Sequence, residues 1–422
     1  MISPGIIVGQ ELRPDILVPL INPGSYDLFM KTDVVVIGGG ASGLFTALDL
    51  STRGADVVLV ERGILLSGTS GRFHGLLHSG ARYAAIDRAA AVECREESAV
   101  IARMAPFAIV SEGGLFIRLK GDDDSYTDRF LKGLNDSGIE FTEADLKEIR
   151  HYDPELSPEV DFAVKVPDRV LDPFKLFYSL ALLAKNRGVK FFLSTEVTGL
   201  DGERRIVHTA RGDIETKVVV NAAGPWANKI LQMYSKEVNM MPALGVMLVY
   251  DARIVHRVIN RLRPPSDGDI ILPFYQKTIV GTTAQLVEDV DDVEILPEDI
   301  QLLVDEGSKM VPILARMVYR RSYYSARPLI GGQDARLASR DFEIIDDDWL
   351  VTVIGGKLTT SRLMAERVSD LVCLKLGIDE GCITKDLVLS YAAQRTPVDG
   401  TIGEDVYGHG LWLASVVGEI SS

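Results

Sequence analysis

The chain has few cysteines. Its 422 residues include only Cys94, Cys373 and Cys382, which lie far apart. Three scattered thiols cannot form a disulfide framework or a Cys-rich metal site. We therefore expect reduced, mostly buried cysteines in a cytoplasmic protein.

Basic residues are scarce relative to acidic ones. The sequence carries 45 Lys and Arg against 60 Asp and Glu, which gives a formal net charge of −15. A nucleic-acid-binding protein needs a surplus of cations to displace the counterions of the phosphates. The composition argues against nucleic acid as a partner, and any cations that bind a ligand must be concentrated locally.

Long apolar runs are also missing. No stretch reaches the roughly 20 apolar residues of a transmembrane helix, so any membrane contact would be peripheral, at the inner face of the cell membrane. Residues 1–29 contain four prolines and lack the basic start and apolar core of a signal peptide. We interpret residues 1–29 as an N-terminal extension or an upstream start.

The most informative pattern lies between residues 33 and 61. An apolar strand runs into Gly38-x-Gly40-x-x-Gly43, a helical pattern follows, and a second strand ends at Glu61. This order is typical of a dinucleotide-binding βαβ unit. Gly38 permits a tight turn, Gly40 lets backbone N–H groups approach a pyrophosphate, and Gly43 lets helix and strand pack closely. Glu61 can accept hydrogen bonds from ribose hydroxyls. The alternative, a glycine-rich turn without a ligand, does not account for the flanking strands and the acid.

The next part of the chain alternates between predicted helices and strands. Asp172 is a predicted N-cap, Pro173 the first helical residue, and Gly188 the stop of the same helix. Other patterns predict helices over 82–104 and 145–153, and strands over 114–119, 162–166, 189–193, 206–209 and 215–220.

Residues 240–330 have a different character. Strand patterns at 244–250, 269–272 and 278–283 are separated by Pro, Gly and Asp, with no regular helix until 297–315. This indicates an antiparallel sheet. The pattern at 349–366 then predicts a strand that meets a glycine pair at a helix start, where free N–H groups could face an anion or an electron-rich ring.

Several motifs together resemble the FAD-dependent glycerol-3-phosphate dehydrogenases, most closely the anaerobic A-subunit type. The match runs in order from about residue 30 to about residue 380. The chain departs from the pattern at Phe73, where a polar residue is expected, and it has no counterpart of the Cys-rich, iron–sulfur-type domain of longer members. The matching motifs are Thr69–Tyr83, Ala163–Pro167, Asp172–Phe174, Val219–Gly224, Val258–Arg261, Tyr324–Leu329 and Gly355–Thr359.

The resemblance implies an α/β fold, with a glutathione-reductase-type, Rossmann-like FAD-binding domain and an inserted antiparallel-sheet substrate domain. The FAD domain would comprise residues 30–109, 166–232 and 338–380, and the substrate domain residues 110–165 and 233–337, followed by a tail at 381–422. FAD is the expected cofactor. Its expected contacts are Gly38, Gly40, Ala41, Ser42, Gly43, Glu61, Arg62, Thr69, Ser70, Gly71, His74, Val197, Ala223, Gly224, Gly355, Gly356, Lys357, Leu358 and Thr359.

The expected substrate is small and anionic. Arg327 precedes a proline that fixes the local backbone, and its guanidinium offers a planar donor fork suited to phosphate. By resemblance, Arg82, Tyr324 and Lys357 are its companions in substrate binding. A solvated or surface-paired role is the ordinary alternative for any such cation.

Two histidines lie four residues apart. By resemblance, His78 occupies the position of the catalytic base, whereas His74 orients the flavin loop. A neutral imidazole can take up a hydroxyl proton near neutral pH, and the nearby cations should disfavour its protonated form. Gly75 and the lack of a ligating acid nearby argue against a metal pair.

The sequence thus predicts FAD-dependent oxidation of sn-glycerol 3-phosphate to dihydroxyacetone phosphate, with hydride transfer to flavin N5. One alternative is an FAD-dependent dehydrogenase or oxidase of a small 2-hydroxy acid or amino acid, because the same cations could bind a carboxylate. Another is a non-catalytic electron-transfer flavoprotein subunit. Oxygen, a quinone or a partner subunit could each reoxidise the flavin.

Overall fold

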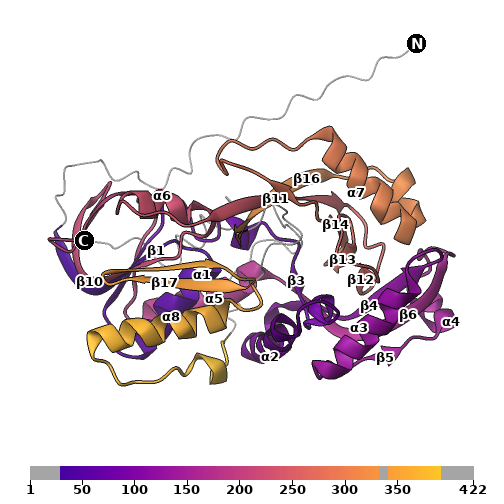
Figure 1. The fold of residues 1–422 in the computed structure, drawn as a ribbon, viewed down its shortest axis with the longest axis horizontal. Coiled ribbons are helices and arrows are strands. Elements are labelled where there is room, and N and C mark those ends of the chain that lie inside the picture. Colours follow the sequence, from indigo (N-terminus) through magenta and orange to yellow (C-terminus); the bar gives the residue numbers. More distant parts are fainter. Residues whose placement is uncertain (1–28, 332–340, 391–422) are drawn as a thin grey trace, which may run out of the picture.

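The computed structural model describes residues 29–331 and 341–390, which form two mixed sheets with helices packed around them (Figure 1). In the first sheet, five neighbouring strands are parallel, and an antiparallel strand lies at one edge. Its order is β17 (Phe342–Asp347), β18 (Leu350–Gly355), β10 (Gly212–Asn221), β1 (Met30–Ile37), β2 (Val57–Val60) and β7 (Lys190–Phe192), with β8 (Val197–Asp201) and β9 (Ile206–Thr209) continuing from β10.

Strand β1 is covered on both faces. Val34 and Val36 pack in the core shared with the helices α1 (Ala41–Thr52), α5 (Pro173–Asn186) and α8 (Ser361–Leu376). Val35 and Ile37 belong to a second core on the opposite face, to which α6 (Ala227–Gln232) contributes. A parallel sheet buried on both sides requires continuous apolar strands, which explains the unbroken apolar run before Gly38.

The second sheet holds ten strands. Its order is β15 (Gln285–Leu286), β11 (Met240–Tyr250), β14 (Lys277–Gly281), β13 (Ile270–Phe274), β12 (Val258–Arg261), β4 (Ile109–Leu119), β6 (Val160–Leu171) and β3 (Leu76–Leu77), with β16 (Arg321–Ile330) beside β11 and β5 (Thr142–Glu143) beside β6.

The predicted antiparallel sheet includes one parallel pair. Strands β12 and β4 are parallel, with Val258 opposite Gly114 and Arg261 opposite Ile117. The two strands come from separate predicted pieces of the substrate domain, so no hairpin turn forces them to run in opposite directions.

Helices cover the second sheet as well. Leu303 and Met310 of α7 (Pro297–Met310) pack on one face, and Phe130 of α3 (Asp124–Asp136) packs on the other. Figure 1 shows α7 and α3 on opposite sides of this sheet. The remaining helices are α2 (Arg88–Met104), α4 (Leu146–Tyr152), and the 3-10 turns η1 (Thr69–Gly71), η2 (Ala81–Tyr83), η3 (Pro106–Ala108), η4 (Gly224–Trp226), η5 (Pro312–Arg316) and η6 (Thr384–Asp386).

Two helix starts differ from the prediction. Helix α2 begins at Arg88 rather than at Arg82, because Gly80 is left-handed and the side chain of Asp87 caps the helix by accepting from the N–H of Ala90. Helix α8 begins at Ser361, so a short turn separates it from the glycine pair. The prediction for α5 is confirmed: the Asp172 carboxylate accepts from the backbone of the first turn.

The chain crosses repeatedly between the two sheets. Strand β3 belongs to the second sheet although residues 30–109 were predicted as one piece of the FAD domain, and strand β6 continues through the predicted boundary at residue 166. We therefore propose Asp172, which directly follows β6, as the point of return to the first sheet. Within the described residues, no helix combines the length and the apolar composition needed to cross a bilayer.

Candidate active site

A cavity of about 1350 Å³ lies between the two sheets. Residues at the carboxyl ends of first-sheet strands, such as Ile37 and Ala222, line one side. Met247, Ile270 and Tyr324 of the second sheet line the other. The carboxyl ends of parallel strands are the usual ligand-binding edge of such sheets. The volume exceeds that of a typical small-molecule pocket, so a dinucleotide and a small substrate fit together.

The glycine motif shapes one end of this cavity. Gly38 has a φ of +112°, and a Cβ atom there would lie 2.6 Å from the Ala222 carbonyl oxygen. A Cβ atom on Gly43 would lie 1.9 Å from the Gly38 oxygen. The start of α1 therefore packs directly against β1, and Gly40, Ala41 and Ser42 line the cavity with the helix N-terminus. This cradle suits a pyrophosphate, which N–H groups and the helix dipole would stabilise.

Glu61 lies beside the same cradle. Its carboxylate accepts from the backbone N–H of Gly39 and of Gly63, both at 2.7 Å. Burial raises the pKa of Glu61, and these two hydrogen bonds partly offset the effect. Each carboxylate oxygen keeps a further lone pair, so Glu61 can still accept from a ribose hydroxyl.

Arg62 lines the cavity and contacts the loop that follows β15 of the second sheet. Its guanidinium lies 2.9 Å from Asp291 and 4.7 Å from the ring centroid of Trp226. Asp291 also accepts from Trp226 Nε1 at 2.8 Å and Lys229 Nζ at 2.6 Å. Burial would raise the pKa of Asp291, but these hydrogen bonds outweigh it and hold that pKa far below its usual range. We call these four residues the Asp291 latch.

Most of the other predicted cofactor residues also line the cavity. Ser70 Oγ accepts from the N–H of Ala41 at 2.9 Å, which ties η1 to the start of α1. Gly43 and Gly71 lie behind the lining and allow close backbone packing. The lining includes Thr69, Ser70, His74, Val197, Ala223, Gly224, Gly355, Gly356, Lys357, Leu358 and Thr359.

The two histidines are held as neutral rings. The N–H of Leu76 donates to His74 Nδ1 at 3.0 Å, so that nitrogen carries no proton. Burial, followed by the charges of Arg82 and Arg327, lowers the pKa of His74 to about 3. For His78, burial followed by Lys357, His74 and Arg82 also lowers the pKa to about 3. The predicted neutral base is thus favoured, although burial is a larger cause than the cations.

His78 is surrounded by aromatic and cationic groups. The side chain is buried, and its ring centroid lies 5.3 Å from that of Tyr83. Lys357 Nζ lies 4.8 Å from the same Tyr83 ring. Tyr83 therefore contacts both the predicted base and a predicted substrate cation, although it was not predicted to be a site residue.

The predicted substrate-binding side chains all line the cavity. Arg327 donates from Nη2 to the Thr283 carbonyl oxygen at 2.7 Å. Tyr324, three residues earlier on β16, lies under the Arg72 guanidinium with 6.0 Å between that group and the ring centroid. The cavity lining carries six Lys and Arg against five Asp and Glu, a slight positive surplus in a chain whose formal net charge is −15.

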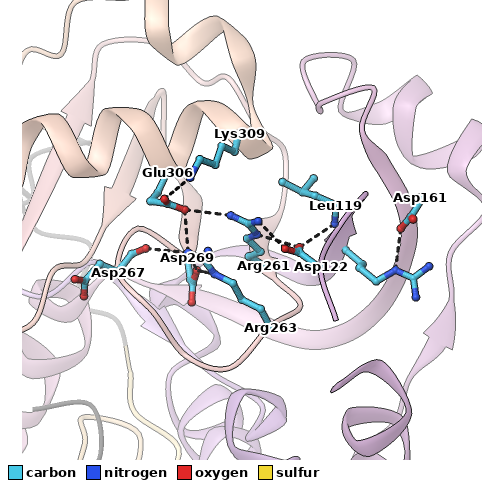
Figure 2. Close-up of polar contacts among 10 residues, drawn as sticks. Leu119, Asp122, Asp161, Arg261, Arg263, Asp267, Asp269, Glu306 and Lys309 are labelled. Carbon is cyan, nitrogen blue, oxygen red and sulfur yellow. Dashed lines mark hydrogen bonds and ion pairs between the residues drawn. The ribbon is translucent and has the colours of Figure 1, made fainter. Parts of the chain in front are cut away.

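A buried acid faces Arg82. Its guanidinium lies 3.6 Å from Asp269. Figure 2 shows how Asp269 itself is held: Arg263 pairs with it at 2.7 Å, and Glu306 links Arg263 to Arg261, with distances of 3.0 and 3.1 Å. Neither Asp269 nor this network was predicted, because its members come from distant parts of the chain.

Comparisons with known proteins agree with this geometry. Residues 33–371 match the model of the DAO family, described as FAD dependent oxidoreductase. The A-subunit of the anaerobic glycerol-3-phosphate dehydrogenase from Escherichia coli K12 is 38% identical over 91% of this chain and 77% of its own length. The A1-subunit of the corresponding Haloferax volcanii enzyme is 39% identical over 84% of this chain and 65% of its own length.

A solved structure has a similar fold. The Bacillus halodurans glycerol-3-phosphate dehydrogenase, crystallised with FAD, superposes with a TM-score of 0.67. It is 26% identical, and the match covers 85% of this chain and 68% of that one.

Proposed function

The chain belongs to the FAD-dependent oxidoreductase family, among the glycerol-3-phosphate dehydrogenases of the anaerobic A-subunit type, and we propose that its cavity oxidises sn-glycerol 3-phosphate to dihydroxyacetone phosphate. One observation carries the proposal most strongly. The cations Arg82, Arg327 and Lys357 share one cavity with two neutral histidines and a dinucleotide cradle. A cavity of this kind suits a small phosphorylated alcohol better than a neutral one.

FAD is the cofactor of the family, and the residues present fit it. Gly40, Ala41 and Ser42 would hold its pyrophosphate at the start of α1, and Glu61 would accept from its ribose. When bound, the flavin supplies a hydride acceptor at N5. We further propose that the segment Gly355–Thr359, which lines the cavity before α8, lies against the flavin ring.

The phosphate would be bound by Arg327, Lys357 and Arg82. Arg327 has a planar fork that can donate two hydrogen bonds to one phosphate, and its contact with Thr283 fixes its orientation. Lys357 contributes a point charge. Arg82 already faces Asp269, so its charge is partly neutralised.

His78 is the proposed base. Among the described residues, its Nδ1 atom is buried without a hydrogen-bond partner, so Nε2 is the nitrogen available to a substrate in the cavity. Proton uptake at Nε2 from the substrate hydroxyl would leave an alkoxide-like oxygen, and the carbon that bears this oxygen would then release its hydride as the C=O bond forms. The nearby cations would stabilise the developing negative charge.

The electron acceptor belongs to the proposal as well. The relatives are named as single subunits of larger enzymes, and we infer that a partner chain or a quinone reoxidises the flavin. The affinity-purified protein, assayed with a soluble quinone analogue before and after removal of copurified chains, would separate these two routes.

A panel of substrates tests the proposed reaction. The FAD-loaded protein is mixed without oxygen with glycerol 3-phosphate, glycerol, lactate, 2-hydroxyglutarate or an amino acid, and flavin bleaching is followed. We expect rapid bleaching by glycerol 3-phosphate and none by glycerol. Faster bleaching by a 2-hydroxy acid or amino acid would favour the alternative oxidase or dehydrogenase. Bound FAD that no substrate reduces would favour a non-catalytic, electron-transfer role.

A further inference from the structure

Behind the cavity wall, a buried acid holds the segment that carries the proposed base. Asp168 is 1% exposed and does not line the cavity. Its Oδ1 atom accepts from the backbone N–H of Ser79 and from Ser79 Oγ, both at 2.7 Å. Ser79 directly follows His78, so the Asp168 carboxylate fixes the peptide that adjoins the base.

Three strands meet at this acid. In the β3–β6 register, Leu76 lies opposite Val170 and Leu77 opposite Arg169, so the next pair along would join His78 to Asp168. On the other side, Asn260 of β12 donates from Nδ2 to Asp168 Oδ2 at 3.2 Å. Each carboxylate oxygen is therefore held by a group from a different strand or turn.

The neighbouring strand β4 leaves space for the Asp168 side chain. A Cβ atom on Gly114 of β4 would lie 2.8 Å from Asp168 Cβ. The β4–β6 register is irregular between Glu112 and Gly114, at the same level of the sheet. A glycine and a bulge thus accommodate a buried carboxylate in the middle of a sheet, a site that would otherwise favour an apolar residue.

Burying a carboxylate costs free energy unless hydrogen bonds or a cation compensate. Burial raises the pKa of Asp168, whereas the Ser79 and Asn260 hydrogen bonds and the charge of Arg82 lower it. Arg82 lies two residues past the Gly80 turn on the same segment as His78. Asp168 therefore interacts with both ends of the segment His78–Arg82.

We propose that Asp168 is a positioning residue for the oxidation reaction. Asn260 holds the Asp168 carboxylate, and Asp168 in turn holds the His78–Arg82 segment through Ser79, so that the base and the substrate-facing arginine keep a fixed relation. The inference rests on the proposed function, because His78 and Arg82 have their roles only in that reaction. Two motifs of the sequence that had no assigned role, Ala163–Pro167 and Val258–Arg261, gain one through the adjoining Asp168 and through Asn260.

A purely structural acid would also destabilise the fold when removed, so the test needs a matched control. Asp153 is equally buried, accepts from the N–H of His256 at 2.7 Å and pairs with Arg257 at 2.9 Å. It does not line the cavity. Asp153→Ala should therefore lower the melting temperature and leave the rate of flavin reduction close to that of the parent.

The experiment compares Asp168→Ala and Asp168→Asn in the FAD-loaded protein. Anaerobic stopped-flow with glycerol 3-phosphate gives the limiting rate of flavin reduction and the half-saturating concentration, and FAD content and melting temperature are measured separately. For Asp168→Ala we expect the limiting rate to fall by about ten- to a hundredfold, because a misplaced base loses its reactive geometry. FAD content should not change, and the half-saturating concentration should change less than the rate.

Asp168→Asn should restore most of the rate. Its amide oxygen can accept from Ser79, and Asn260 Oδ1, which has no partner among the described residues, can accept from the new amide after a flip of the Asn260 side chain. An Asn variant as slow as the Ala variant would overturn the proposal. So would an Ala variant that reduces its flavin within about twofold of the parent.

If Asp168→Ala does not fold, the variant Ser79→Ala tests the positioning role of Asp168 instead. This change removes one of the two donors to Asp168 Oδ1 and keeps the backbone one, so we expect a loss of about three- to tenfold in rate at an unchanged melting temperature. A rate equal to that of the parent would reject the inference. If the parent itself is not reduced by glycerol 3-phosphate, the proposed function fails instead, and the two failures remain distinct.

Discussion

At the scale of single residues, the site combines groups that are neutral with groups that are permanently charged. His74 and His78 have pKa values lowered to about 3, so both rings are neutral across the physiological range. Arg327 keeps its charge at any such pH. The cavity can therefore attract an anion and accept a proton without the two tasks competing for one group.

His78→Gln tests the proposed base. Gln keeps a similar size and can hydrogen-bond, but it cannot take up a proton near neutral pH. We expect the anaerobic rate of flavin reduction by glycerol 3-phosphate to fall by about 10²- to 10⁴-fold, the usual contribution of a positioned base. FAD should stay bound. His208→Gln, on β9 and away from the cavity, is the control. If His78→Gln reduces its flavin within about twofold of the parent rate, another group or water must act as the base.

The same histidine makes stability depend on pH. In the unfolded chain His78 takes up a proton below about pH 6.5, whereas burial keeps it neutral in the folded state until about pH 3. The unfolded state thus binds more protons in this window, and stability is lost as the pH falls from 6.5 towards 3.

For His78 alone the loss should be on the order of 2 kcal/mol at pH 5. Urea unfolding of the parent and of His78→Gln at pH 7 and pH 5 measures it: the parent should lose more stability than the variant. His151→Gln, on the exposed end of α4, should behave like the parent. Equal losses in the parent and in His78→Gln would show that His78 takes up its proton in the folded state as well.

Arg327→Lys separates charge from geometry at the proposed phosphate site. Lys keeps the charge but loses the fork, so the half-saturating concentration of glycerol 3-phosphate should rise by about tenfold or more, with an unchanged flavin spectrum. Arg253→Lys serves as the control because Arg253 also donates to a backbone carbonyl, that of Tyr275, but lies off the cavity. An unchanged half-saturating concentration would show that Arg327 is not a phosphate clamp.

At the scale of elements, patterns within short stretches of sequence predicted most of the helices and strands that short-range interactions determine. The β1–α1–β2 unit and the capped helix α5 follow from glycines, caps and apolar periodicity within short windows. The start of α2 was predicted less accurately. The residues after Gly80 have a helical composition, but the turn at Gly80 delays the helix to Arg88. Arg82 consequently lies in η2 on the cavity wall and not within a helix.

Contacts between distant elements left no local pattern to detect. Asp269 faces Arg82 and Asp168 holds Ser79 only because separate strands meet in the second sheet. Arg62 illustrates the same limit, since its partner Asp291 is 229 residues away in the sequence. The sequence motifs identified many of the residues that line the cavity, but long-range packing determines what each of them contacts.

Gly40→Val tests the cradle at the start of α1. A Cβ atom at this position would lie 3.2 Å from Ser70 Oγ, and the branched side chain would occupy space that the pyrophosphate needs. The purified variant should lose most of its yellow colour. Gly381→Val, where a Cβ atom meets nothing within 4 Å, should keep its FAD. Full flavin content in Gly40→Val would show that the pyrophosphate lies elsewhere.

At the scale of the whole molecule, the two sheets enclose the cavity. The Asp291 latch links the loop after β15 of the second sheet to side chains that follow strands β2 and β10 of the first. The latch side chains are partly exposed, so each ion pair alone should be weak and sensitive to salt. Because three donors converge on one carboxylate, their combined effect on the closure of the cavity should be measurable.

Asp291→Asn should therefore speed the release of FAD by about three- to tenfold, as expected for the loss of a few partly exposed ion pairs. Release can be followed by the rise in flavin fluorescence after dilution, at low and at high salt. The parent should become more like the variant as salt increases. Asp289→Asn is the control, because it removes the charge that lies 3.5 Å from Lys229 but keeps an oxygen that can accept from the Asp291 N–H. Identical release from the parent and Asp291→Asn would exclude the latch from FAD retention.

The repeated crossing of the chain between the sheets has a consequence for split forms of the protein. A break in the turn between β8 and β9 would leave strands of both sheets on each fragment. The upstream fragment would carry β1 and β4, and the downstream fragment their partners β10 and β12. Neither half could complete a sheet alone. Coexpressed halves should reassemble through the β1–β10 and β12–β4 ladders, so flavin colour in such cells would report fragment complementation.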